Sequence, residues 1–152
     1  LLRFRMMTEG TDVVMGRLTW DSLPKSMRPL PDRTNHVITN DKSWNEPGAN
    51  RISDISELER KGPAKNKRVW VIGGAGLLSA SFDRADLVVV TEVTPAKGTT
   101  IEADVFLDTK KILGPRTGVC GKGWSLLCKE ELMPDVFGGE VFTWKQYIKT
   151  GS

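Results

Sequence analysis

The sequence predicts an α/β protein of three layers, in which helices cover both faces of a mostly parallel central sheet. Strand-like and helix-like segments alternate through residue 93, and such alternation is typical of parallel sheets. Two apolar runs, 13–15 and 69–72, each stop at a glycine and pass into a helix-like segment. At such a switch, the backbone N–H groups at the helix start face whatever lies beyond the strand end. The sequence therefore predicts anion-binding geometry at two strand ends.

The individual elements follow from apolar periodicity and from the residues that interrupt it. Apolar residues at positions 1, 2, 4, 6 and 7 predict a first helix over Leu1–Thr8 that ends before Gly10. Ser53 is the expected N-cap of a helix over 54–61. The glycine-rich stretch 109–123 is the expected mobile loop. The remaining predicted helices are 19–23 and 76–82, and the predicted strands are 12–15, 35–39, 50–52, 68–72, 86–93, 124–132 and 140–147, the last two joined through 133–139.

Composition indicates an ordinary globular protein. A length of 152 residues suits one domain over 1–152 whose core needs neither disulfide nor metal. The hydrophobic share of 39% and the charged share of 27% exclude a disordered chain, and no window has the length and apolarity of a membrane span. Lys and Arg give a net charge of +3 but form no basic stripe, so no nucleic-acid partner is expected.

Cysteine and histidine usage predicts neither a metal site nor a redox motif. Cys120, Cys128 and His36 do not have the spacing of a zinc site or a redox dithiol, so reduced structural thiols are expected. The first seven residues are basic and too short in their apolar part for a secretory signal. A cytoplasmic location is therefore expected.

Four motifs, taken together, identify a family. They are MGRLTWDSLP from Met15, RPLPDRTN from Arg28, VWVIGGAG from Val69 and ADLVVVTEV from Ala85. Their order and spacing over Val13–Val93 resemble dihydrofolate reductase, and the resemblance becomes loose after Thr94.

The resemblance implies a dihydrofolate reductase-like fold with an antiparallel C-terminal strand. It also implies an oxidoreductase that uses NADPH to reduce 7,8-dihydrofolate to 5,6,7,8-tetrahydrofolate, for one-carbon metabolism and nucleotide synthesis. Antifolate inhibitors are implied as further ligands, and a monomer is implied for the complete protein.

The resemblance further implies a cofactor-binding set at the two glycine switches. Arg17 matches a contact of the 2′-phosphate, where a guanidinium favours NADPH over NADH because it binds phosphate bidentately. Thr19 matches a pyrophosphate contact, and Thr39 and Asn40 match positions near the adenine ribose phosphate. Taken alone, the glycines also suit a packing turn, and Thr-Asn suits an ordinary turn. The full implied set is Gly16, Arg17, Leu18, Thr19, Thr39, Asn40, Ile72, Gly73, Gly74, Ala75, Gly76 and Leu77.

A substrate-binding set is implied in the same way. Arg33 matches the arginine that pairs with the α-carboxylate of the folate glutamate, and Phe4 an aromatic that packs on the pterin and benzoyl rings. Thr91 matches a hydroxyl that hydrogen-bonds the catalytic carboxylate, and it is the one catalytic residue implied within the chain. Asp32 replaces a usual glycine and brings a carboxylate beside Arg33. The full implied set is Leu1, Phe4, Arg28, Leu30, Arg33, Ile72 and Thr91, whose apolar members equally suit a core.

The resemblance leaves two alternatives open. The family's central strand and its catalytic Asp or Glu would precede Leu1, so the chain as given is expected to show negligible reductase activity by itself. One alternative is a pyrimidine reductase of flavin biosynthesis with the same fold, against which Arg28 and Arg33 speak, because that substrate has no glutamyl tail. The other is a non-catalytic nucleotide-binding relative. An Asp or Glu encoded directly before Leu1 would favour the enzyme.

Overall fold

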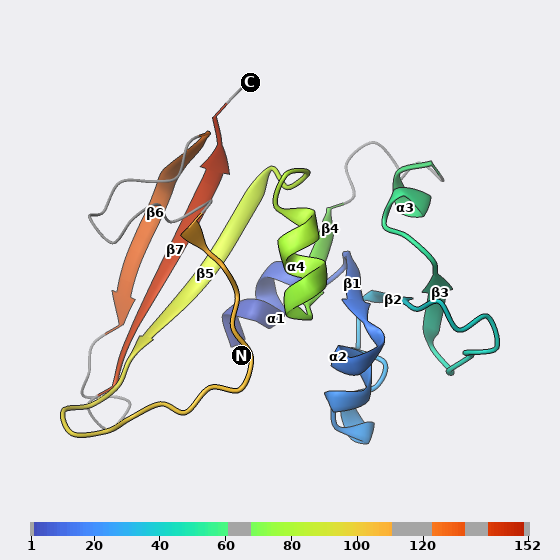
Figure 1. The fold of residues 1–152 in the computed structure, drawn as a ribbon, viewed down its shortest axis with the longest axis horizontal. Coiled ribbons are helices and arrows are strands. Elements are labelled where there is room, and N and C mark those ends of the chain that lie inside the picture. The colour runs from blue at the N-terminus through green and yellow to red at the C-terminus, as the bar shows by residue number, and fades with distance from the viewer. Residues whose placement is uncertain (1, 61–67, 111–122, 133–139, 151–152) are drawn as a thin grey trace. The chain divides into compact units, whose positions relative to one another are not determined.

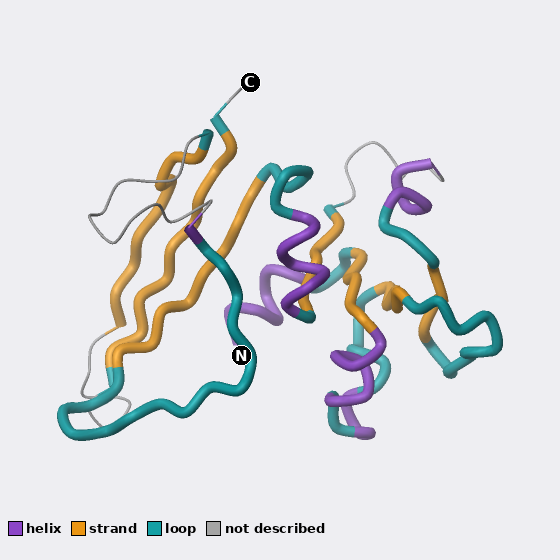
Figure 2. The backbone as a smooth tube through the Cα atoms, viewed as in Figure 1, coloured by secondary structure: helices purple, strands orange, loops and turns teal. Residues whose placement is uncertain are grey.

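A computed structural model of the chain describes residues 2–60, 68–110, 123–132 and 140–150. They belong to two compact units, Leu1–Ser81 and Phe82–Ser152. Figure 2 shows that helices are confined almost entirely to the first unit, whereas the second consists mainly of long strands.

The first unit contains a parallel sheet of four strands, β1 (Asp12–Gly16), β2 (Thr34–Ile38), β3 (Ala49–Ile52) and β4 (Val69–Gly73), in the order β3-β2-β1-β4 (Figure 1). Its helices are α1 (Leu2–Thr8), α2 (Arg17–Ser22), α3 (Ser56–Arg60) and α4 (Ala75–Ser81), with a short 3-10 helix, η1, at Lys25–Met27. In the strand pairing, Gly16 lies opposite Ile38, and Met15 lies opposite Gly73. The carboxyl ends of β1, β2 and β4 therefore lie together at one edge of the sheet.

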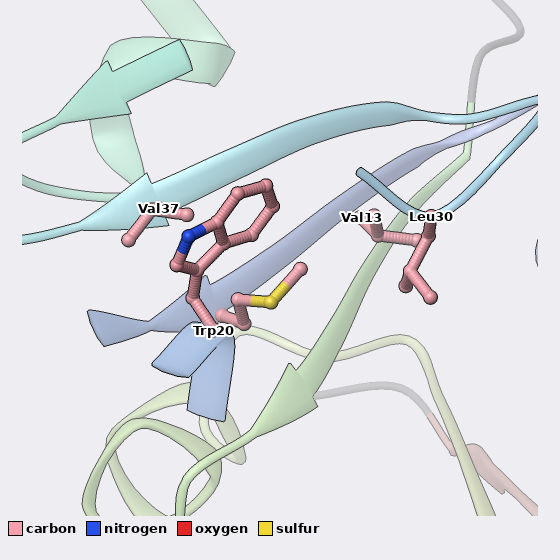
Figure 3. Packing of buried hydrophobic residues seen from close by; sticks show 5 residues of the cluster. Val13, Trp20, Leu30 and Val37 are labelled. Carbon is pink, nitrogen blue, oxygen red and sulfur yellow. The ribbon is translucent and has the colours of Figure 1, made fainter. Parts of the chain in front are cut away.

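The core of the first unit explains why α2 packs on this sheet. Trp20 of α2 is 1% exposed and packs with Val13, Met15, Leu30 and Val37. Figure 3 shows its indole beside β2, close to Val37. Burying an aromatic ring of this size stabilises the fold by roughly 2–3 kcal/mol. This packing fixes the start of α2 at the end of β1.

The second unit is an antiparallel sheet of three strands, β5 (Leu87–Thr94), β6 (Trp124–Leu132) and β7 (Val141–Lys149), in the order β5-β7-β6. Its core consists of Phe82, Trp124 and Tyr147, against which Val88 and Val90 of β5 pack.

The predicted α/β class is confirmed, and the predicted elements are present with ends shifted by a few residues. The antiparallel C-terminal strand that the resemblance implies is also confirmed, because β7 pairs antiparallel with β5. The prediction that Ser53 caps the third helix is wrong. The helix begins at Ser56, whose backbone N–H donates to Asp54 Oδ1 at 2.7 Å, while Ser53 donates to the Glu57 carboxylate. Residues 111–122 of the expected mobile loop, and 133–139, lie outside the described residues.

Candidate functional site

The two glycine switches meet at the carboxyl edge of the parallel sheet. They line a cleft of about 310 Å³ formed by the start of α2 and the start of α4. The lining residues are Gly16, Arg17, Leu18, Thr19, Gly74, Ala75, Gly76 and Leu77. All eight belong to the cofactor set that the sequence predicts, so the structure brings the central part of that set together.

Thr19 and two glycines make the closest approach in this cleft. A Cβ on Gly73, whose φ is +155°, would lie 3.1 Å from both Thr19 Cγ2 and Thr19 Oγ1. A Cβ on Gly74 would lie 3.4 Å from Thr19 Oγ1, and the peptide bond between the two glycines is cis. A side chain at Gly73 would therefore push the two switches apart, so glycine is needed here for both conformation and space.

Arg17 extends the cleft toward the end of β2. Its Nη1 donates to Asp41 Oδ2 at 3.4 Å, and its Nε lies 3.6 Å from Asp21 Oδ2. A solvated arginine at a helix start would be unfavourable without a nearby anion. Here two carboxylates supply that anion, so the position of Arg17 does not by itself require a bound phosphate.

Asp41 is held by several hydrogen bonds. Its Oδ1 accepts from the Ser43 hydroxyl at 2.6 Å and from the Ser43 N–H at 3.0 Å. These bonds, together with the charges of Arg17 and Arg51, hold the pKa of Asp41 below its ordinary value. The Asp41 N–H donates to Oγ1 of buried Thr39 at 3.2 Å, and neighbouring Asn40 is exposed. Thr39 and Asn40 thus lie beside the Arg17–Asp41 pair, as members of one cluster.

Arg33 occupies a second polar cluster, at the end of α1. Its Nε donates to Thr8 Oγ1 at 2.7 Å, its Nη1 to the Pro31 carbonyl at 2.5 Å and its Nη2 to the Arg5 carbonyl at 3.2 Å. Its guanidinium carbon lies 5.9 Å from the centroid of the Phe4 ring. A guanidinium has five N–H donors. These contacts leave one N–H on each Nη for a carboxylate.

The carboxylate expected beside Arg33 does not pair with it. Asp32 has a φ of 59°, and its carbonyl accepts from the Gly10 N–H at 2.7 Å. The Asp32 side chain is exposed and forms no ion pair with Arg33 in the described part of the chain. Asp32 thus adopts the left-handed conformation that glycine takes most easily, and its carboxylate does not compensate the charge of Arg33.

Within the first unit, Leu30, Ile72 and Arg28 of the predicted substrate set do not line one common cavity. Leu30 is 6% exposed and belongs to the core, Ile72 packs against that core, and Arg28 lines a separate cavity of about 390 Å³ with Trp20, Lys25, Glu46 and Pro47. Thr91, expected inside an apolar strand, is exposed on β5, which is an edge strand of its sheet. Leu1 lies outside the described residues.

Three residues that are not predicted from the sequence organise these clusters. Thr8 is 1% exposed, and its hydroxyl joins Arg33 to the Phe4 carbonyl, to which it donates at 2.8 Å. Asn35, also 1% exposed, donates to the Leu30 carbonyl and accepts from the Leu30 N–H. Asp41 could have been found from the Asp-x-Ser spacing, which is typical of a side-chain-capped turn.

The described residues contain neither a membrane-spanning helix nor a cluster of metal-ligating side chains. No helix there has the length and apolarity needed to cross a membrane. Within the same ranges, no group of three or more His, Cys, Asp or Glu side chains could hold a metal ion.

Comparison with known proteins shows which family the chain resembles. A family model for dihydrofolate reductase matches residues 1–111. Dihydrofolate reductase of Saccharomyces cerevisiae is 34% identical over 110 residues, covering 66% of this chain and 52% of that protein. The Mycobacterium tuberculosis enzyme is 38% identical over 90 residues, which are 59% of this chain and 53% of that protein. The Mycobacterium leprae enzyme is 40% identical over 97 residues, which are 61% of this chain and 56% of that protein. The chain thus spans about half the length of these relatives.

A solved structure supports the same fold. Dihydrofolate reductase from Enterococcus faecalis, complexed with NADP(H) and RAB-propyl, aligns with a TM-score of 0.77 at 18% identity, over 99% of this chain and 80% of that one. The family model covers well over half of the sequence, and its match includes both glycine switches and Arg33. The chain belongs to the dihydrofolate reductase family.

Proposed function

We propose that this chain binds NADPH and 7,8-dihydrofolate and serves a dihydrofolate reductase, an oxidoreductase that yields tetrahydrofolate for one-carbon metabolism. The observation that supports it best is the cleft in which Arg17 and Thr19 converge with the glycines at 73, 74 and 76. Membership of the family supports the reaction that we assign, and the cleft supports the position that we assign to the cofactor.

The cleft fits a dinucleotide in shape and in its polar groups. Gly73 and Gly74 lie so close to Thr19 that a Cβ at Gly73 would crowd that side chain. The same lack of side chains allows a pyrophosphate to approach the backbone. Thr19 contributes a hydroxyl, and Arg17 a guanidinium directed toward the end of β2. In this proposal Thr19 and the glycines bind the pyrophosphate, and Arg17 binds the 2′-phosphate.

The Arg33 cluster suits the carboxylate end of the substrate. When bound, NADPH supplies the hydride, and the protein contributes binding and orientation. Arg33 presents one unused N–H on each Nη beside the half-exposed ring of Phe4. We assign Arg33 to the α-carboxylate and Phe4 to the aromatic rings of the substrate. Thr91 remains the proposed partner of a catalytic carboxylate.

Cofactor binding tests the first half of the proposal. NADPH and NADH are titrated against the wild-type chain, Arg17→Ala and Arg28→Ala, with NADPH fluorescence as the readout. Arg17→Ala should weaken NADPH binding by roughly 1.5–3 kcal/mol, the scale of a hydrogen bond to a charged group, and leave NADH nearly unchanged. Arg28→Ala removes the same side chain from a different cavity and should change neither affinity. Equal losses for both cofactors would assign Arg17 a structural role.

Substrate length tests the second half. In the complete protein, Arg33→Ala should raise the KM for dihydrofolate, because the glutamate carboxylate loses its partner at a cost of about 2–5 kcal/mol. Arg33→Lys should recover only part of the loss, since lysine has no planar fork. A pterin without the glutamyl tail should be insensitive to both substitutions. If Arg33→Ala impairs the two substrates equally, the folate assignment is wrong.

The proposal extends to the setting of the protein. Family membership supports a cytoplasmic location, a monomer for the complete protein and antifolate inhibitors as competing ligands. Size-exclusion chromatography of the complete protein with light scattering tests the monomer, and displacement of dihydrofolate by an antifolate tests the shared site.

A further inference from the structure

Arg17 already has anionic partners before any phosphate arrives. Its Nη1 lies 3.4 Å from Asp41 Oδ2 and its Nε 3.6 Å from Asp21 Oδ2, while half of its side chain is exposed. A 2′-phosphate that binds this guanidinium must share or displace those carboxylates. The environment of Arg17 therefore affects how strongly it can select a phosphorylated ligand.

Asp41 differs from Asp21 in how firmly it is placed. The Ser43 hydroxyl and N–H fix its Oδ1, its own N–H donates to Thr39 Oγ1 at 3.2 Å, and Arg51 Nε donates to its carbonyl at 2.8 Å. Thr39 is buried at the end of β2. These bonds hold the Asp41 carboxylate beside Arg17. Asp21 lies one helical turn after Arg17 and is shared with Arg28 at 3.8 Å.

We propose that Asp41 is a specificity-determining residue that lowers the preference of this site for a 2′-phosphorylated nucleotide. The inference rests on the proposed function, because it takes Arg17 as the 2′-phosphate contact. Asp41 Oδ2 competes with the phosphate for Arg17 Nη1, and its charge repels the phosphate directly. A 2′-hydroxyl meets neither penalty and can donate a hydrogen bond to the carboxylate, as it does to an acidic residue in other dinucleotide sites. Asp41 therefore reduces the discrimination that Arg17 provides.

Two adenine nucleotides isolate this effect from the rest of the cofactor. Adenosine 2′,5′-bisphosphate and 5′-AMP are titrated by calorimetry against the wild-type chain, Asp41→Asn and Asp21→Asn. Asparagine retains an oxygen that accepts from the Ser43 N–H, so the turn is preserved while the charge is removed. Asp41→Asn should raise the affinity for the bisphosphate roughly three- to tenfold and leave that for 5′-AMP within about twofold.

Asp21→Asn is the matched control, because it removes the same charge from the other side of Arg17. Its effect on the ratio of the two affinities should stay below about twofold. In an Arg17→Ala background, Asp41→Asn should change the ratio less than it does in the wild type, since only the direct repulsion remains.

The outcomes separate this inference from the function on which it rests. If both nucleotides bind but Asp41→Asn leaves unchanged or lowers the ratio of the affinity for the bisphosphate to that for 5′-AMP, Asp41 does not weaken phosphate binding. The proposed function then stands. An equal rise in Asp21→Asn would also overturn the inference, because the effect would then be one of net charge. If neither nucleotide binds the wild-type chain or Asp41→Asn, the cofactor assignment falls together with the inference.

Discussion

Replacing Arg33 by alanine should lower the free energy of unfolding of the first unit by about 2–4 kcal/mol. The hydrogen bond from Nε to the buried hydroxyl of Thr8 accounts for about 1.5–3 kcal/mol, because its donor is charged and its surroundings are partly desolvated. The two bonds from Nη1 and Nη2 lie at exposed positions and add less, as does the contact with Phe4. A domain stable by about 5–15 kcal/mol remains folded after this loss.

Urea denaturation followed by circular dichroism measures the total effect, and amide exchange locates it. The Gly10 N–H donates to the Asp32 carbonyl and the Thr34 N–H to the Thr11 carbonyl, so both amides report on how α1 joins the residues around Arg33. Their exchange should accelerate in Arg33→Ala more than that of amides in β3 and in residues 35–38 of β2. Thr8→Val should show a coupling of about 1–2 kcal/mol with Arg33→Ala in a double-mutant cycle, since the two variants remove the same bond.

Arg28→Ala provides the matched control, because the same side chain is removed from a position with a single ion pair of 3.8 Å to Asp21. The cost there should stay below about 1 kcal/mol. Equal destabilisation by the two substitutions, or additive effects of Arg33→Ala and Thr8→Val, would refute the argument that the contacts of Arg33 hold the end of α1.

Three further predictions follow from single positions. Asp32→Gly should raise the free energy of unfolding by about 0.5–1 kcal/mol in urea denaturation, because φ is +59° there, and Asp32→Ala should not. Gly73→Ala should lower the free energy of unfolding by about 1–3 kcal/mol, because the new Cβ would contact Thr19. Gly76→Ala in α4 should raise the free energy of unfolding by up to about 1 kcal/mol, because no atom lies within 4 Å of the new Cβ. Destabilisation by both substitutions would contradict the argument that space distinguishes the two glycines. The pKa of Asp41 is lowered on folding, so the ionised carboxylate stabilises the folded protein at pH values above the ordinary aspartate pKa of about 3.9. This stabilisation is lost as the pH falls through the lower folded-state pKa. The difference in Tm between wild type and Asp41→Asn should therefore shrink from pH 7 to pH 3.

Local pattern was sufficient to predict the elements of the first unit. The glycines after β1 and β4 each end an apolar run, and this pattern predicts anion-binding geometry at two strand ends. The structure adds that the two ends meet, because a Cβ on Gly16 would lie 3.8 Å from the Gly74 nitrogen.

The polar clusters could not be predicted in the same way. Arg33 finds Thr8 and Arg5 at separations of 25 and 28 residues, and no periodicity encodes which carbonyl a guanidinium will reach. The partner of β5 could not be predicted for a related reason, because its apolar run suits a buried parallel strand as well as an antiparallel one. Its partner β7 lies about 50 residues away in the sequence, beyond the reach of local pattern.

The register of the parallel sheet also predicts the order in which the cleft forms during folding. Thr34 of β2 is roughly 20 positions from its partner Asp12 in β1, whereas Val69 of β4 is roughly 60 positions from the same residue. Closing the longer loop costs about 0.8 kcal/mol more chain entropy, so β2 should pair with β1 before β4 does. The half of the cleft that contains Arg17 and Thr19 is then in place before Gly73 and Gly74 arrive. A refolding chain should therefore acquire its buried Trp20 core first and the complete nucleotide cleft last.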